Sequence, residues 1–198
     1  MPDPVLSLRQ LSVAFEAEGG PLTVVQDLSL DLHAGQSLGL VGESGSGKTM
    51  VGLSAMRLVP SPGRITTGQV LLEGVDLLRL DDAAVRRLRG SRIAVVLQDP
   101  MASLNPTLTI GTQMVEALRA HARISDHDAR ARACEALGRV GITQAQTRLD
   151  AYPHQFSGGM RQRVAIATAM LHRPRVLIAD EPTTALDVTT QAQILAEV

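Results

Sequence analysis

The 198-residue sequence predicts an α/β fold with a core of parallel strands. Three observations lead to this prediction. An apolar run that is expected to form a strand, Leu38–Val41, precedes a glycine-rich loop, and a helix-like run from Met50 to Leu58 follows that loop. Two further apolar runs, Ile93–Leu97 and Val176–Ala179, have the composition of strands that are buried on both faces. A stretch with helical spacing separates these two runs, as expected where helices and strands share one domain.

The first third of the chain predicts an N-terminal antiparallel β region. Segments 5–15 and 22–32 alternate apolar and polar residues, and the turn residues at 18–21 join them. The helix after the glycine-rich loop is expected to stop near Pro60. The remaining elements expected before residue 100 are a short strand at 68–72, a turn at Glu73-Gly74, and a short helix capped by Asp81 or Asp82 and ending at Leu88.

The character of the sequence changes after Gln98. From about residue 100 to 155 the strand signals fade, and Ala, Arg and Leu recur at helical spacing. We expect an inserted helical subdomain of about three helices there, within one domain whose core comprises 1–99 and 156–198. A further helix is expected after Gly159, from Arg161 to about His172, and a last helix is expected to begin near Asp187 or Val188.

The composition argues against several classes of partner. The formal net charge is −1, aromatic residues make up 2% of the chain, and Trp is absent. A broad electrostatic or base-stacking grip on nucleic acid is therefore not indicated. No apolar run approaches the roughly 18 residues that cross a bilayer, so work at a membrane would need another subunit as anchor. The single cysteine, Cys134, suits a reducing compartment.

The glycine-rich loop predicts a phosphate-binding site. It fits the pattern G-x-x-x-x-G-K-[ST] at every required position. Its glycines let successive N–H groups face one phosphate chain, and the following helix adds its positive end. Lys48 supplies a mobile charge for the outer phosphates, and Thr49 supplies a hydroxyl for Mg²⁺. The alternative is a chance Gly/Ser-rich turn. The expected nucleotide contacts are Gly42, Glu43, Ser44, Gly45, Ser46, Gly47, Lys48, Thr49 and Met50.

A second acidic element follows the apolar run 176–179. Asp180 at the tip of a strand suits a magnesium ligand, acting through a metal-bound water. Glu181 can then orient or polarise the water that attacks the γ-phosphate. The alternative is an acidic pair that caps a turn before Pro182.

The residues Ser157, Gly158 and Gly159, here called the Ser157 corner, precede a long helix. Backbone N–H groups at such a helix start can form a second anion site. One triphosphate does not need two such sites in one chain. The economical explanation is that the corner binds a nucleotide held by a partner subunit, and the alternative is an ordinary helix start.

Four blocks, at 41–49, 97–111, 152–171 and 176–195, resemble the ATPase subunits of ABC transporters, in particular those of dipeptide and oligopeptide importers. The resemblance implies ATP and Mg²⁺ as cofactors and a head-to-tail dimer that sandwiches two nucleotides. It implies that Gln98 contacts Mg²⁺ and the lytic water, that the Ser157 corner closes over the opposite subunit's ATP, and that Asp187 lies in a loop crossing the dimer interface. Phe15 is the candidate for stacking on adenine, with a core strand residue as the alternative.

The resemblance also implies partners and a location. These are integral-membrane permease subunits, a second ATPase subunit that is identical or paralogous, and an extracytoplasmic solute-binding protein that acts indirectly, with no nucleic acid. The chain would sit at the cytoplasmic face of the membrane and power uptake of a peptide, nickel, glutathione or another small solute.

One departure from the family pattern affects the expected activity. The resemblance implies a switch histidine about thirty residues beyond the strand-end acidic residues Asp180 and Glu181. No histidine follows His172 in this sequence. We therefore expect a C-terminally incomplete domain, and little ATPase activity from residues 1–198 alone. Two alternatives stay open, a soluble ABC ATPase without a transport role and a catalytically impaired remnant.

Overall fold

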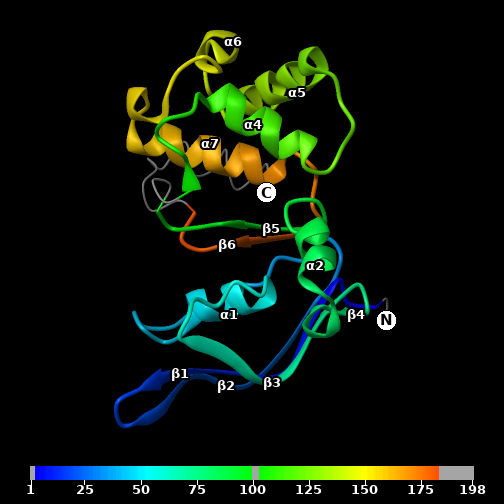
Figure 1. Cartoon of the computed structure of the whole chain (residues 1–198), viewed down its shortest axis with the longest axis vertical. Helices are drawn as coiled ribbons and strands as arrows, with labels where there is room; N and C mark the ends of the chain where they lie inside the picture. Colours follow the sequence, from blue (N-terminus) through cyan, green and yellow to red (C-terminus); the bar gives the residue numbers. More distant parts are fainter. Residues whose placement is uncertain (1–2, 100–102, 183–198) are drawn as a thin grey trace. The chain divides into compact units, whose positions relative to one another are not determined.

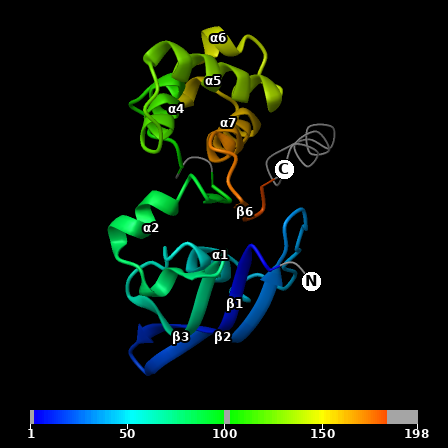
Figure 2. The same ribbon diagram turned by 90° about the vertical axis from the view of Figure 1, so that its right-hand side faces the viewer.

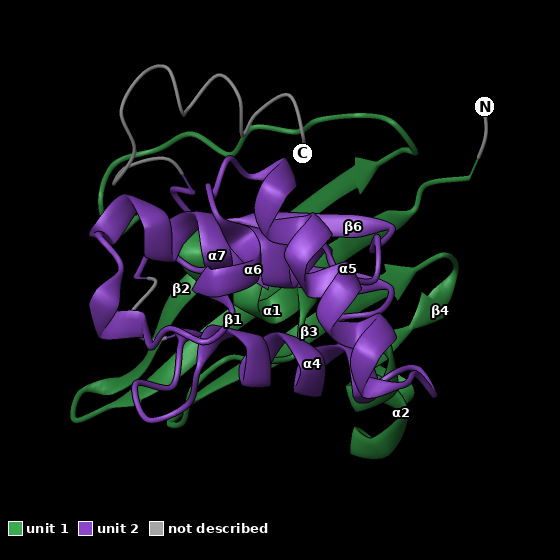
Figure 3. Ribbon diagram, turned by 90° about the horizontal axis from the view of Figure 1, so that it is seen from above, with its two compact units in different colours: residues 1–89 green, residues 90–198 purple. Residues whose placement is uncertain are grey.

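The computed structural model describes residues 3–99 and 103–182. The chain divides into two compact units, residues 1–89 and residues 90–198, which Figure 3 draws in separate colours. Both units combine helices with strands, so the predicted α/β class is confirmed. The predicted Asp187 loop and last helix lie outside the described residues.

Unit 1 is built on an antiparallel sheet with the strand order β2-β1-β3-β4 (Figure 1). The strands are β1 (Leu6–Ala17), β2 (Gly20–Leu32), β3 (Gly63–Leu72) and β4 (Val75–Asp76). Leu8, Leu11 and Val13 of the central strand β1 are at most 1% exposed, so these side chains belong to the packed core of this unit. The predicted N-terminal antiparallel region is confirmed, and β3 begins five residues earlier than expected.

The helix after the glycine-rich loop, α1 (Lys48–Ala55), packs on this sheet and contacts β1, β2 and β3 (Figure 2). It ends earlier than the expected Leu58 because Arg57 adopts a left-handed conformation, with φ of 52°. The Arg57 guanidinium donates to the carbonyls of Leu77 and Leu80 at 3.0 and 2.7 Å, which fixes this turn.

The rest of unit 1 is short and helical. A 3-10 helix, η1 (Leu77–Arg79), leads into α2 (Asp82–Leu88). Asp81 is the N-cap of α2, and its carboxylate accepts a hydrogen bond from the Ala84 N–H at 2.6 Å. The predicted capped helix is therefore confirmed.

The expected strand at Leu38–Val41 is wrong for this structure. The segment pairs with no strand among the described residues and has no regular secondary structure. Leu38, Leu40 and Val41 are 46%, 45% and 98% exposed, whereas a strand of this composition would bury them. The physical reason is that a strand needs a neighbour for its N–H and C=O groups, and β1, β2, β3 and β4 pair only with one another.

Unit 2 contains a parallel pair of strands, β5 (Ile93–Val96) and β6 (Val176–Ala179). Ile93 lies opposite Val176 and Val96 lies opposite Ala179, so the carboxyl ends of the two strands meet. Both strands match the apolar runs of the sequence, and the predicted parallel arrangement is confirmed.

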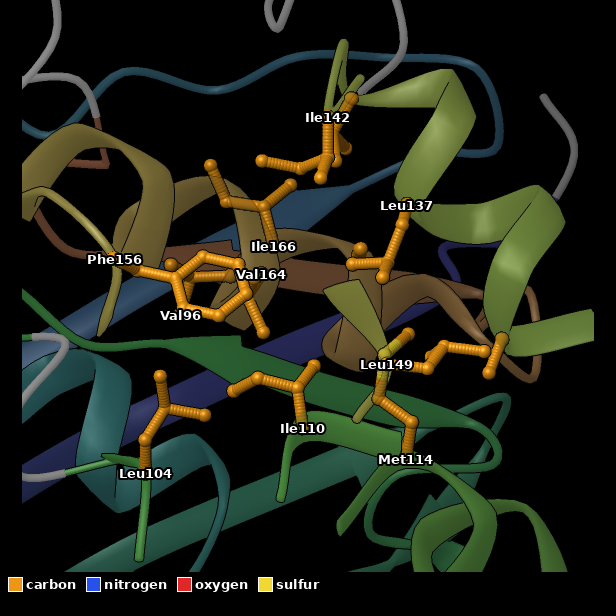
Figure 4. Close-up of a cluster of buried hydrophobic side chains, with 13 residues drawn as sticks. Val96, Leu104, Ile110, Met114, Leu137, Ile142, Leu149, Phe156, Val164 and Ile166 are labelled. Carbon is orange, nitrogen blue, oxygen red and sulfur yellow. The ribbon is translucent and has the colours of Figure 1, made fainter. Parts of the chain in front are cut away.

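The helices of unit 2 lie between β5 and β6 in the sequence. They are α4 (Ile110–Arg119), α5 (Asp126–Arg139), α6 (Ala145–Arg148), the 3-10 helix η2 (Pro153–Gln155) and α7 (Gly158–Met170). A single cluster of buried side chains joins the helices to β5, and Phe156 lies within it (Figure 4). The boundaries predicted for the helical subdomain, about 100–155, stay a prediction. No described helix is both long and apolar enough to span a bilayer.

Candidate functional site

The glycine-rich loop of unit 1 curls because two of its glycines adopt positive φ angles, 82° at Gly45 and 89° at Gly47. A Cβ on Gly47 would lie 2.5 Å from the carbonyl oxygen of Val24 on β2. Only glycine fits a left-handed conformation this close to a backbone atom. Strand β2 therefore restricts which residue can stand at position 47 of the loop.

Lys48 begins α1 and folds back over the loop. Its Nζ donates to the carbonyl oxygens of Gly42 and Glu43, both at 2.8 Å. The N-cap residue Gly47 offers no side chain to the first N–H groups of α1. A mobile ammonium and uncapped helix N–H groups thus lie at one place, which is the arrangement that binds phosphate oxygens. The predicted loop contacts, Gly42 to Met50, all belong to this segment, and their binding role stays a prediction.

In unit 2, Gln98 and Glu181 meet beyond the carboxyl ends of β5 and β6. The Gln98 Nε2 donates to Glu181 Oε2 at 2.8 Å. Both side chains are exposed, and Glu181 has a φ of 48°, an uncommon conformation that turns the chain sharply after the strand. The two residues predicted to handle the attacking water are thus brought together across 83 positions of sequence.

Asp180 is tied to the same strand end, because its N–H donates to the Val96 carbonyl at 2.9 Å. Asp180 and Gln98 belong to unit 2, and Thr49 belongs to unit 1. A hydroxyl, an amide oxygen and a carboxylate are the hard oxygen donors that Mg²⁺ prefers, so the predicted set fits this ion chemically. The described residues contain no cluster of three His, Cys, Asp or Glu side chains that could hold a metal without help from a ligand. Phosphate oxygens would have to complete the coordination.

The Ser157 corner opens α7. The Ser157 Oγ accepts a hydrogen bond from the Met160 N–H at 3.3 Å and so caps the helix. Ser157 and Gly158 are exposed, and a Cβ added to Gly158 would meet nothing within 4 Å. The fold therefore does not need glycine at 158, in contrast to Gly47.

Phe15 lies on β1 and is half-buried. It is paired with Gly63 of β3, and a Cβ on Gly63 would lie 2.5 Å from the Phe15 ring. The ring therefore covers the glycine across the strand pair, which supports the core alternative left open by the sequence. The adenine contact stays a prediction.

Arg161, which lies one turn into α7, is a residue that the sequence motifs do not single out. Its Nε donates to the carbonyl oxygens of Pro153 and Phe156 at 2.9 and 3.0 Å. These two carbonyls belong to the segment that leads into the Ser157 corner. The available signal was an arginine one turn after the helix start, where it can reach back to the preceding loop.

A family model described as "ABC transporter" matches residues 25–184. The chain belongs to the ABC transporter family. This ABC family chain is 50% identical over 192 residues to the dipeptide transport ATP-binding protein DppD of Bacillus subtilis, a match that covers 96% of the chain and 57% of DppD. It is 46% identical to the oligopeptide transport ATP-binding protein OppD of the same organism, over 96% of the chain and 54% of OppD. The chain thus spans about half the length of these curated relatives.

Other relatives and solved structures agree with this assignment. The glutathione import ATP-binding protein GsiA of Salmonella choleraesuis is 50% identical over 96% of the chain and 32% of its own length. The dimeric structure of a bacterial ABC transporter cassette matches with a TM-score of 0.87 and 28% identity, over 96% of this chain and 80% of that one. The same cassette, in a post-hydrolysis state bound to ADP and Pi, matches equally well.

Proposed function

We propose that this ABC family member is the ATP-binding subunit of an importer and that it binds and hydrolyses ATP with Mg²⁺. The observation that carries the proposal is the hydrogen bond of 2.8 Å between Gln98 and Glu181 at the ends of β5 and β6. A carboxylate beside an amide, next to a strand-end aspartate, can orient a water molecule and withdraw its proton. Lys48 and the loop N–H groups would stabilise the charge that develops on the phosphates.

The second part of the proposal is a head-to-tail dimer. Each nucleotide would lie between the Lys48 loop of one subunit and the Ser157 corner of the other. The open space at Gly158 supports this role, because an exposed glycine without a steric reason in its own fold suits close approach by a ligand. The dimeric state of the matching cassette supports it too.

The third part concerns cargo and partners. The names of the relatives, which refer to dipeptides, oligopeptides or glutathione, favour a peptide or a related small solute. Integral-membrane permease subunits would hold the ATPase at the cytoplasmic face of the membrane, and a solute-binding protein outside would deliver cargo. Closure of the nucleotide sandwich would move the permease, and hydrolysis would reopen it.

Replacement of Glu181 by glutamine in the full-length protein tests the catalytic assignment. We expect ATP hydrolysis to fall by roughly 10²-fold or more because the general base is lost. ATP should still bind and should hold the subunits together as a stable dimer, measured by light scattering after gel filtration. Glu116→Gln, a change at an exposed glutamate of α4, is the control and should hydrolyse ATP normally. A Glu181→Gln protein that turns over ATP freely as a monomer would contradict the assignment.

A soluble ABC ATPase without a transport role is the second candidate function. Purification of the tagged protein from detergent-solubilised membranes distinguishes this candidate from the importer subunit. Integral-membrane subunits should copurify at fixed stoichiometry if the importer assignment is right. Recovery with ribosomes or nucleic acid instead would favour the alternative.

A further inference from the structure

We propose that Arg161 is a positioning residue that holds the Ser157 corner in the orientation that meets the opposite subunit's nucleotide. The inference rests on the proposed function, because it concerns the same composite site. It begins from the contact described above, in which one guanidinium N–H is shared between the carbonyls of Pro153 and Phe156.

The contact with the Phe156 carbonyl sets the direction of the next N–H group. Among the described residues, the one cis peptide bond joins Ser61 to Pro62, so the Phe156–Ser157 peptide is trans. In a trans peptide the C=O and the N–H point to opposite sides of the chain. Because the Phe156 carbonyl faces Arg161, the Ser157 N–H faces away from this guanidinium. Arg161 therefore fixes the direction of the first donor of the corner.

Other contacts hold the same segment, among them a second cation, the Arg148 guanidinium, which lies 5.6 Å from the centroid of the Phe156 ring. At the end of η2, the Phe156 N–H donates to the Pro153 carbonyl at 3.1 Å. At its start, the Tyr152 N–H donates to the Gln155 side chain at 2.8 Å. The Phe156 ring is 3% exposed and anchors the segment in the unit 2 core. These contacts fix where the segment lies. Arg161 adds the link between the segment and the helix whose N-terminus forms the corner.

The link also concentrates positive potential at the corner. The Arg161 guanidinium lies against the segment that leads into α7, and the N-terminus of that helix already favours an anion through the helix dipole. The Pro153 and Phe156 carbonyl oxygens carry partial negative charge, and their hydrogen bonds from this cation reduce the repulsion that they would exert on an approaching phosphate. Loss of the guanidinium would both loosen the corner and return that negative charge.

The test uses the full-length protein carrying Glu181→Gln, whose ATP-driven dimer reports on the corner. Arg161→Met keeps the apolar stem and removes the donor, and Arg161→Lys retains a cation. Arg163→Met is the matched control, because Arg163 lies on the same helix but donates to the Gly141 carbonyl at 2.9 Å, outside the corner. Three quantities are measured: ATP affinity of the dilute monomer, the ATP concentration that gives half-maximal dimer, and the melting temperature.

We expect Arg161→Met to raise the ATP concentration for half-maximal dimerisation about tenfold or more, since a hydrogen bond from a charged donor is lost. ATP affinity of the monomer should stay within about twofold, because the Lys48 loop is untouched. Arg161→Lys should give an intermediate value, and Arg163→Met should dimerise like the parent.

Two results would overturn the inference. One is an Arg161→Met protein that dimerises at the parental ATP concentration. The other is that Arg161→Met and Arg163→Met lose dimerisation, monomer ATP affinity and melting temperature to the same extent. That result would mean that Arg161 has a purely structural role. If Arg161→Met does not fold, the Arg161→Lys protein decides. The inference is overturned if that protein forms the dimer at the same ATP concentration as its parent and with the same pH profile. Failure of the Glu181→Gln parent itself to dimerise with ATP would instead count against the proposed function.

Discussion

Lys48 is the only lysine in the 198-residue chain, although Lys and Arg together number 19. Its ammonium donates hydrogen bonds to the carbonyls of Gly42 and Glu43. Phosphate oxygens can replace these two acceptors with charged ones, which makes stronger hydrogen bonds. Nucleotide binding should therefore withdraw Lys48 from solvent and from reagents that modify amines.

Replacement of Lys48 by alanine should lower ATP affinity by about 10²-fold, because hydrogen bonds to a charged group and a Coulomb attraction are lost together. Lys48→Arg should not restore binding, since the planar guanidinium cannot fold over the tight loop as the ammonium does. Equilibrium binding of a fluorescent ATP analogue measures both. In the unmodified protein, ATP should protect Lys48 from acetylation, read by mass spectrometry. Equal acetylation with and without ATP would contradict this role.

Gly47 and Gly158 offer a matched comparison between a glycine that the fold needs and one that it does not. Gly47→Ala forces a side chain into a φ of 89° and against the Val24 carbonyl, so we expect a loss of more than about 1 kcal/mol in free energy of unfolding. Gly158→Ala meets open space and should change that free energy by less than about 1 kcal/mol. Chemical denaturation measures both values.

The same Gly158→Ala protein should lose ATP-driven dimerisation while it keeps ATP binding, because the new methyl group enters the space assigned to the opposite nucleotide. Dimer formation in the Glu181→Gln background is the measurement. A Gly158→Ala protein that dimerises as well as its parent would show that the corner has no ligand in close approach.

Among the elements, α7 carries an amide with no apparent purpose in the described structure. Gln162 is 1% exposed, and within residues 3–99 and 103–182 neither its Nε2 nor its Oε1 has a hydrogen-bond partner. A buried polar group left unpaired destabilises a fold by about 1–3 kcal/mol. Gln162→Met should therefore raise the free energy of unfolding by about 1 kcal/mol.

Gln113→Met on α4 is the control for this prediction. The Gln113 amide is fully used, since it accepts from the Asn105 N–H at 2.8 Å and donates to the carbonyls of Asn105 and Leu108 at 3.0 and 3.1 Å. Its loss should lower the free energy of unfolding by about 1–3 kcal/mol. Urea titrations should thus give changes of opposite sign, and equal losses from both variants would contradict the unpaired state of Gln162.

The elements also show where prediction from the sequence stops. The meeting of Gln98 with Glu181 was predictable, because each follows an apolar run and parallel strands end at one edge. The end of α1 was not, since Arg57 is held by the carbonyls of Leu77 and Leu80, about twenty positions away. The segment Leu38–Val41 has a strand composition, but pairing depends on a neighbour that local sequence does not reveal.

For the whole molecule, the predicted site is divided between the two units. Lys48 and Thr49 belong to residues 1–89, whereas Gln98, Ser157, Asp180 and Glu181 belong to residues 90–198. The motifs predicted each part of the site because each depends on local backbone geometry, such as a glycine turn or a strand end. Arg161 was not predicted, because its partners are backbone carbonyls. Every residue type has a backbone carbonyl, so the sequence does not mark such partners.

The most direct measurement is a structure of the full-length Glu181→Gln protein bound to ATP and Mg²⁺. We predict that the γ-phosphate lies within about 3.5 Å of Lys48 from one subunit and of the Ser157 corner from the other. A γ-phosphate held by Lys48 with every Ser157 corner remote from any nucleotide would contradict the proposed composite site.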